Sequence, residues 1–240
     1  MSDLFQPLED HPAYRQIAQR IEQRIVDRTL RAGDPLPSES DLARQFGVNR
    51  STVREAIREL ETQGLLGRDP GRKRLRVTRP EPDSLSLGMS RALALHDVTF
   101  SELWEAMMAI EPAAAEHAAE RRSAAALHAL VGTCARFRRE HADTTAAVAA
   151  VVDFFTAVAA ASANRVLALA QAPVNRLLAP TLAALIDRVP QARTRIEEAQ
   201  SRITAAIRER RPEVARTWME KHIRDFKRGY ELSLRTRAGG

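Results

Sequence analysis

Two arginines four residues apart are the side chains in this sequence best suited to a specific chemistry. They stand in a polar run at a predicted helix start: Asn49, Arg50, Ser51, Thr52 and Arg54. Residues four apart share one helix face, and an arginine fork can donate two hydrogen bonds to guanine O6 and N7 in the major groove of DNA. The free N–H groups at a helix start also suit a phosphate. The run therefore predicts contact with nucleic acid, and the alternative is a solvated helix face.

The elements around this run predict how it would be positioned. Isoleucines at steps of four predict a helix within residues 12–29. Ser38 is suited to cap a short second helix that ends at Gly47, and the third helix ends at Gly64. Residues 65–77 have the pattern of strand, tight turn and strand. Three helices followed by a β-hairpin is the order of a winged helix-turn-helix.

Basic charge is concentrated in the same part of the chain. Residues 44–79 hold ten Lys and Arg against four acidic residues, a net charge of +6 that equals the excess of all 240 residues. Such a concentration is typical of a polyanion-binding surface. In the turn of the hairpin, Gly71 allows close backbone approach, and Arg72 and Lys73 can reach phosphate or the minor groove. Arg58 is explained equally well by an ion pair with a neighbouring glutamate.

The segment LPSESDLARQFGVNRSTVREAIRELETQGLL resembles the N-terminal domain of the GntR family of bacterial regulators, and the likeness covers residues 12–77. The resemblance implies DNA contacts from the third helix and the wing. Many members carry arginine after LPSE, where this chain has Ser40, so one contact is lost or is supplied by Arg44. The predicted DNA-binding residues are Ser40, Arg44, Asn49, Arg50, Ser51, Thr52, Arg54, Gly71, Arg72 and Lys73.

The rest of the chain is predicted to be helical. We expect a winged helix-turn-helix domain over residues 1–77, a polar linker over 78–86, an all-α antiparallel bundle over 87–234 and a disordered tail over 235–240. Six apolar stripes at helical spacing mark the helices of the bundle. The predicted fold class is therefore mainly α.

One apolar stretch has the composition of a membrane helix. Residues 146–163 are mostly alanine, but Asp153 is at their centre, where a charge costs about 2.5–3.5 kcal/mol in a bilayer. We therefore predict a buried helix and no membrane association. The single Cys134 excludes an internal disulfide, and the start of the chain has no signal-peptide pattern. A cytoplasmic location is expected.

Residues 98–230 resemble the FCD-type effector domain of the FadR-like branch of the GntR family. Many members bind a divalent metal through one Asp and three His. Alignment on Ala161-Ser162-Ala163-Asn164, which matches a family segment ending in Ala-Ser-Gly-Asn, puts Val151 and Phe155 at the first two ligand positions. Gln200 occupies the third, and only His222 is kept. Because valine and phenylalanine cannot ligate a metal, we predict no metal and no cofactor. A shifted alignment would make Asp153 a ligand.

A further family position bears on the effector. An arginine that contacts acidic effectors is replaced here by Met107. Since a buried carboxylate needs a metal, an arginine or several N–H donors, we expect an uncharged or mostly apolar effector. The predicted effector-binding residues are Met107, Val151, Phe155, Gln200, Trp218 and His222. The alternative role for His222 is that of a core histidine bonded to Gln200 or to a backbone carbonyl.

Together these features predict a DNA-binding transcriptional regulator, expected to be a repressor controlled by a small molecule. One reading helix recognises one half-site, so we expect a homodimer on a palindromic operator, with half-sites about 34–36 Å apart. The alternative is a constitutive DNA-binding dimer that has lost its effector. An enzyme is not expected: the sequence has no G-x-S-x-G motif and only three lysines.

Overall fold

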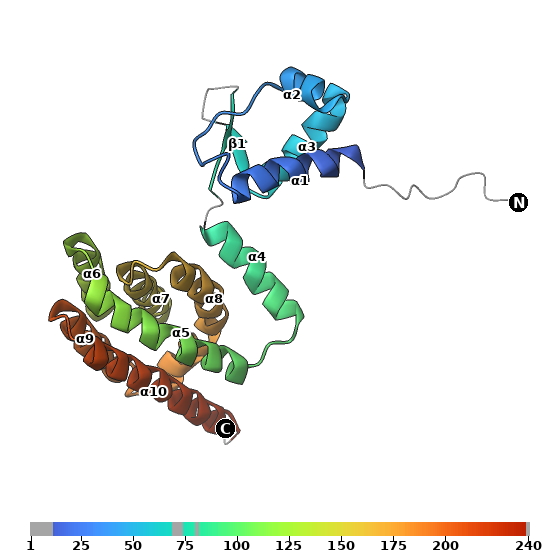
Figure 1. Cartoon of the computed structure of the whole chain (residues 1–240). Coiled ribbons are helices and arrows are strands. Elements are labelled where there is room, and N and C mark those ends of the chain that lie inside the picture. Colours follow the sequence, from blue (N-terminus) through green and yellow to red (C-terminus); the bar gives the residue numbers. More distant parts are fainter. Residues whose placement is uncertain (1–11, 69–73, 80–81, 239–240) are drawn as a thin grey trace, which may run out of the picture. The chain divides into compact units, whose positions relative to one another are not determined.

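Three helices followed by a two-stranded antiparallel sheet make up the N-terminal part of the computed structural model (Figure 1). The structure describes residues 12–68, 74–79 and 82–238. The elements of the first unit are α1 (Ala13–Val26), α2 (Glu39–Phe46), α3 (Arg50–Thr62), β1 (Leu66–Arg68) and β2 (Leu75–Val77). The predicted order of helices and hairpin is confirmed.

Local chemistry sets the ends of these helices. The Ser38 hydroxyl accepts a hydrogen bond from the Asp41 amide at 3.2 Å, as expected of an N-cap. Gly47 ends α2 with φ 68°, and Gly64 follows α3 with φ 73°, both in the left-handed region that favours glycine. Val53 and Leu60 of α3 are completely buried against the other elements. The exposed face of α3 is therefore fixed by the packing of its opposite side.

The second unit begins at Pro82 and is all-helical over its described residues. Its helices are α4 (Pro82–Leu95), α5 (Phe100–Arg121), α6 (Ala124–Glu140), α7 (Thr144–Ala161), α8 (Arg165–Arg188), α9 (Ala192–Arg208) and α10 (Pro212–Ala238). By length and composition α7 could cross a membrane, yet Ala150, Phe154 and Val158 on it are completely buried in the bundle core. The apolar stretch is thus a central core helix in this fold.

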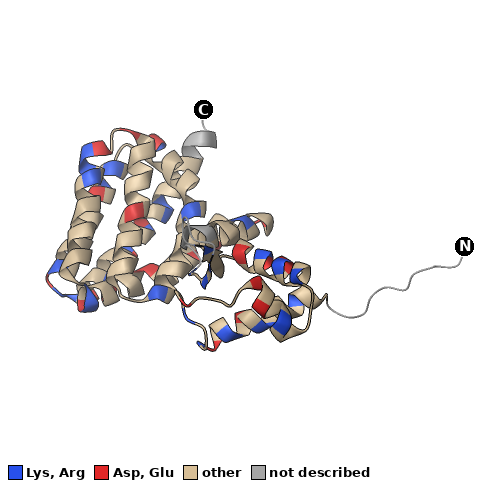
Figure 2. Cartoon of the chain, turned by 90° about the horizontal axis from the view of Figure 1, so that it is seen from above, with Lys and Arg blue, Asp and Glu red and all other residues tan. Residues whose placement is uncertain are grey.

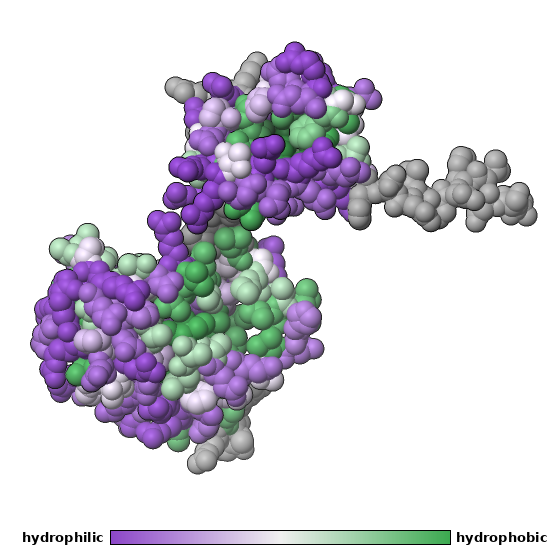
Figure 3. Space-filling model, in the orientation of Figure 1, coloured by the Kyte–Doolittle hydropathy of each residue, from purple (hydrophilic) through white to green (hydrophobic). Residues whose placement is uncertain are grey.

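Two predicted boundaries differ from the structure. The linker expected over residues 78–86 is helical from Pro82, because proline fits the first turn of a helix and serines on one side of α4 are buried. Ser90 donates to the Ser86 carbonyl at 2.7 Å and to the Pro173 carbonyl of α8 at 3.4 Å. The tail expected to be disordered from residue 235 continues α10 to Ala238. Apolar side chains of α4 that face outward are visible in Figure 3.

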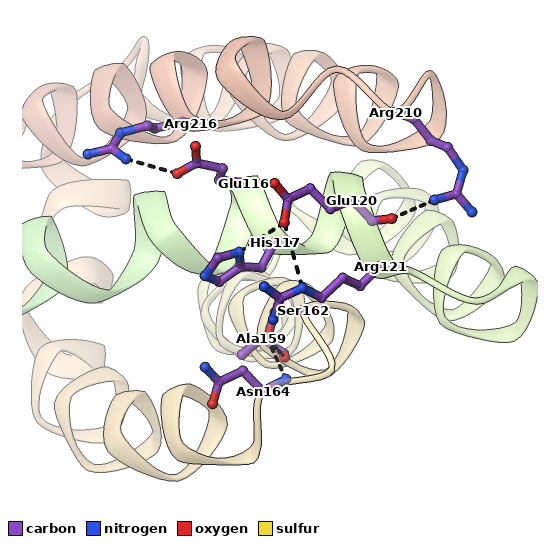
Figure 4. A network of polar contacts seen from close by, with 9 residues as sticks. All are labelled: Glu116, His117, Glu120, Arg121, Ala159, Ser162, Asn164, Arg210 and Arg216. Carbon is purple, nitrogen blue, oxygen red and sulfur yellow. Dashed lines mark hydrogen bonds and ion pairs between the residues drawn. The ribbon is translucent and has the colours of Figure 1, made fainter.

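Polar contacts join α5 to the chain around the start of α10 (Figure 4). Arg216 binds the Glu116 carboxylate at 2.8 Å. Arg210, just before α10, donates to the Glu120 carbonyl near the end of α5 at 2.6 Å. These contacts hold α10 along α5, so residues of the two helices can line a common space.

The turn between α7 and α8 has an unusual backbone. Ser162 donates to the Ala159 carbonyl at 2.6 Å and accepts from the Asn164 amide at 3.1 Å (Figure 4). Asn164 in turn caps α8 by accepting from the Val166 and Leu167 amides. Ala163 lies between them with φ 54°, a left-handed conformation without the freedom of glycine.

Each tryptophan of the chain is paired with a lysine of α10. The Trp104 indole of α5 donates to the Ile223 carbonyl at 3.2 Å, and Lys227 Nζ lies 4.0 Å from its ring centroid. Lys221 Nζ lies 4.4 Å from the ring centroid of Trp218. Both arrangements are cation–π contacts.

Candidate DNA interface and effector pocket

The polar run at the start of α3 faces solvent. Asn49, Arg50 and Ser51 are exposed, and Thr52 is half-buried. Asn49 has the extended backbone of an N-cap, but its side chain makes no capping hydrogen bond. The first amides of α3 and the Asn49 amide group therefore remain available to a ligand at this helix start.

Arg54 is held in place by a carboxylate that sequence reasoning did not identify. Its Nε and Nη2 atoms donate to Glu39 Oε2 at 3.2 and 3.1 Å. Arg68 of β1 lies 3.7 Å from the other Glu39 oxygen and 3.1 Å from Glu61 Oε1. This arginine–carboxylate network links α2, α3 and the hairpin around the predicted reading side chain. The signal in the sequence was the glutamate of the LPSE motif.

The remaining predicted DNA-binding residues occupy two places. Ser40 and Arg44 are exposed on α2, where Arg44 pairs with Asp41 at 2.6 Å. Gly71, Arg72 and Lys73 fall outside the described residues. In Figure 2 acidic positions along the ribbon are interspersed with basic ones in both units. Basic charge in the first unit is therefore partly neutralised by ion pairs before any partner binds.

Four of the six predicted effector residues line one cavity in the second unit. Met107 of α5, Val151 and Phe155 of α7, and His222 of α10 all contribute to it. Most of the remaining lining is apolar and comes from α8, α9 and α10, including Leu178, Leu182, Leu185, Ile196, Ile223 and Phe226. The free space is about 60 Å³, room for several waters at about 10–15 Å³ each.

His222 supplies a neutral polar group to this apolar space. Its ring stacks on Phe155, with centroids 5.7 Å apart and planes 12° apart. Burial lowers the pKa of His222 to about 4, an effect that the Asp225 charge partly opposes. The imidazole is therefore uncharged at neutral pH, with one donor and one acceptor nitrogen. Among the described residues, no hydrogen bond joins it to Gln200 or to a backbone carbonyl.

Gln200 and Trp218 do not line this cavity. Gln200 is buried one turn beyond Ile196 on α9, and its backbone carbonyl lies 4.0 Å from Cys134 Sγ of α6. Gln200 shares a helix face with Ile196 but lies one turn further along α9, beyond the residues of that helix that line the cavity. Trp218 lines a neighbouring shallow hollow together with Arg195 and Lys221.

Sequence reasoning missed three polar residues that do line the cavity. They are Asn175 of α8, Arg195 of α9 and Asp225 of α10. Asn175 is buried and lies one turn after Gln171, which is also buried. A pair of amides at helical spacing inside an apolar, proline-containing helix was the available signal.

The residues at the metal positions do not fit a metal. Val151 and Phe155 line the cavity but offer no ligand atom. Asp153, the alternative ligand, is half-exposed and forms an ion pair with Arg136 of α6. Within the described part of the chain, no three His, Cys, Asp or Glu side chains come together. The absence of metal stays a prediction that elemental analysis can test.

Comparisons with known proteins match both units. Residues 13–73 match the family model of bacterial regulatory proteins of the gntR family, and residues 102–225 match the FCD domain. The HTH-type transcriptional repressor NanR of Cronobacter sakazakii is 28% identical over 90% of this chain and 85% of its own. The repressor MngR of Escherichia coli is 53% identical, but over only 23% of each chain.

Two further matches extend over most of the chain. The Glc operon transcriptional activator of Escherichia coli is 25% identical over 92% of this chain and 89% of its own. The solved structure of a Streptococcus agalactiae GntR protein is similar, with a TM-score of 0.64 and 26% identity over 90% of this chain and 99% of that one.

Proposed function

Because this chain belongs to the GntR family of bacterial regulatory proteins, carries an FCD domain and is a DNA-binding transcriptional regulator, we propose that it reads its operator with the start of α3. Arg50 and Arg54 would contact base edges in the major groove, and Asn49, Ser51 and Thr52 would contact phosphate or bases. The observation that supports this most is Arg54, held by Glu39 on the exposed face of α3.

The first prediction tests this assignment. Arg54→Ala should cost about 1–3 kcal/mol of operator binding and relax sequence preference at one position of each half-site. Arg24→Ala removes an exposed arginine from α1 and is the matched control, with little expected effect. Arg72→Ala, in the wing, should weaken binding to all sequences alike. Fluorescence anisotropy against an operator obtained by selection from random DNA measures all three. An Arg54→Ala affinity equal to the parent's would refute the placement.

The cavity of the FCD domain is the proposed effector site. Met107, Val151, Phe155 and His222 enclose an apolar space within the bundle, and a bound molecule there would contact α5, α7 and α10 together. A constitutive dimer without an effector would have no use for such a space. We propose that the effector is uncharged or mostly apolar and that its binding changes DNA affinity.

The direction of regulation is proposed to be repression. NanR and MngR are named repressors, whereas the Glc operon regulator is named an activator. A reporter gene under the selected operator distinguishes the two: deletion of the regulator raises expression in the first case and lowers it in the second.

A further inference from the structure

Asn175, a polar residue of the cavity lining, is backed by Glu111, a second buried polar residue that is outside the lining. Asn175 of α8 lines the cavity and is 5% exposed, and its Nδ2 atom makes no hydrogen bond of ordinary geometry within the described part of the chain. Glu111 of α5 is 1% exposed, and among the described residues its Oε2 atom also lacks a well-formed hydrogen bond. Glu111 lies one turn along α5 from Met107, which lines the same cavity.

Unpaired buried groups of this kind are uncommon in folded proteins and call for a specific explanation. An amide NH2 group has two N–H donors, so at the wall of a cavity one of them is available to a molecule inside even where the other points towards Glu111. Burial raises the pKa of the Glu111 carboxyl to about 8, and a weak hydrogen-bonding contact with the Asn175 side chain opposes this only in part. At neutral pH the carboxyl is therefore mostly protonated and able to donate a hydrogen bond.

The charged residues of the cavity lining do not favour a charged ligand. Arg195 and Asp225 both contribute to the lining and carry opposite charges. Asp225 also accepts a hydrogen bond from Arg228 at 3.4 Å. Because these two charges cancel and His222 is neutral, the lining has no net charge that a carboxylate or an ammonium group could neutralise.

On the basis of the proposed role of this cavity as the effector site, we propose that Asn175, held from behind by Glu111, forms the polar end of the cavity. The ligand this end would take has an apolar body ending in an uncharged group that both donates and accepts hydrogen bonds, such as a hydroxyl or a primary amide. Asn175 would donate to the oxygen of that group through Nδ2 and accept from the group through Oδ1, and Glu111, behind Asn175 and outside the lining, would orient the amide.

A set of small probes with one apolar body tests this proposal. 1-Butanol and butanamide carry heads that donate and accept, butanone only accepts, and butanoate and butylammonium are charged. Methyl NMR shifts of Val151 and Ile223, which line the cavity, report binding of each probe to the full chain. We expect the alcohol and the amide to bind about tenfold more tightly than the charged probes, the effect of one or two well-made hydrogen bonds.

Three substitutions assign that preference to residues. Asn175→Leu removes the amide at similar volume and should reduce the preference for the alcohol and amide to about twofold. Glu111→Gln keeps a neutral, hydrogen-bonding group of nearly the same shape and should retain the preference for the alcohol and the amide. This variant still tests the proposal if Asn175→Leu does not fold. Gln171→Leu is the matched control: it removes a buried amide one turn away on α8 that does not line the cavity, and it should leave the preference intact.

Other outcomes would overturn the proposal. Tightest binding of butanoate would assign the head group to Arg195 instead. Equal binding of all probes, or none, would mean that the two groups serve a trapped water or the fold alone. A loss of preference in Gln171→Leu would remove the assignment to Asn175. Because binding is measured without DNA, probes that bind as expected but leave operator affinity unchanged would refute the effector role while leaving the polar end in place.

Discussion

Arg54 is the residue on which the proposed operator reading depends most, and its contact with Glu39 limits how it can move. A guanidinium that donates twice to one carboxylate has fewer rotamers open to it. The same carboxylate is a negative charge placed close to the expected path of DNA phosphates. Glu39 should therefore sharpen base selection while lowering affinity for DNA in general.

Glu39→Gln separates these two effects. The variant should bind random DNA several-fold more tightly, because one repulsive charge is gone, and should show a smaller ratio of operator to random affinity. Competition titrations at fixed salt measure both constants, since the affinity falls with salt as counterions are released. Glu22→Gln makes the same change of charge on an exposed residue of α1. If both variants behave alike, Glu39 acts only through net charge.

Two buried ionisable groups predict how stability depends on pH. The pKa of Glu111 is about 8 in the folded chain against an ordinary 4.5. The folded state therefore binds more protons than the unfolded state in that range, and the contribution of Glu111 declines as pH rises from 4.5 to 8. The pKa of His222 falls to about 4 from 6.5, so its contribution is complete above pH 6.5 and is lost as pH falls towards 4.

Between pH 6.5 and 8 only the contribution of Glu111 to the free energy of unfolding changes with pH. The free energy of unfolding should decline there by about 1 kcal/mol per pH unit. Urea denaturation at several pH values measures it. Glu111→Gln should flatten this slope, whereas Glu105→Gln, at an exposed position of the same helix, should not. A parent protein with constant stability over this range would show that Glu111 keeps an ordinary pKa.

At the scale of elements, the turn between α7 and α8 offers a simple gain in stability. Ala163 has φ 54°, where an L-residue loses about 1–2 kcal/mol relative to its preferred conformations. Ala163→Gly should raise the free energy of unfolding by about 1 kcal/mol. Ala160→Gly, an exposed helical position three residues earlier, should lower it by up to about 1 kcal/mol. Thermal unfolding of the two variants compares them, and a shift of the same sign in both would exclude the backbone explanation.

Most elements were predictable from the sequence because their apolar residues recur at the spacing of a helix or of a strand. Leu103, Met107 and Ala114 mark α5, and alternating residues around a Pro-Gly turn mark the hairpin. It failed at α4, where proline and serine resemble a loop. There Ser86 and Ser90 are buried, and the Ser90 hydroxyl donates to the backbone carbonyls of Ser86 and of Pro173 on α8. The contact with α8 cannot be seen in the local sequence pattern.

The candidate sites were predictable to the extent that they lie on one helix face. Val151 and Phe155 are one turn apart on α7, and both meet His222 in the cavity. Gln200 is on the helix face that lines the cavity but does not line it, because it lies one turn beyond Ile196 on α9, beside Cys134 of α6. Asn175 and Glu39 were missed because their roles come from residues distant in sequence.

For the molecule as a whole, a homodimer remains a prediction from its DNA chemistry. One α3 helix reads one half-site, so two copies are needed for a palindrome. Light scattering at micromolar concentration should give twice the mass of one chain. Inserting about five base pairs, half a helical turn, between the half-sites should abolish tight binding, because the second half-site then faces away. A monomer in solution that binds the altered operator equally well would contradict the dimer.

Because of the two lysine–tryptophan contacts, tryptophan fluorescence could report on the proposed effector-binding unit. Trp104 and Trp218 are the two tryptophans of the chain, so the winged helix contributes no indole emission. Lys221 and Lys227 flank His222 and Phe226 along α10, and both of these residues line the cavity. A ligand that shifts α10 relative to α5 would change the electric field of the Lys227 ammonium on the Trp104 ring and move the emission wavelength of Trp104, whereas Lys221 and Trp218 both lie on α10 and would move together. Effector occupancy could then be followed by the wavelength of tryptophan emission, without an added dye.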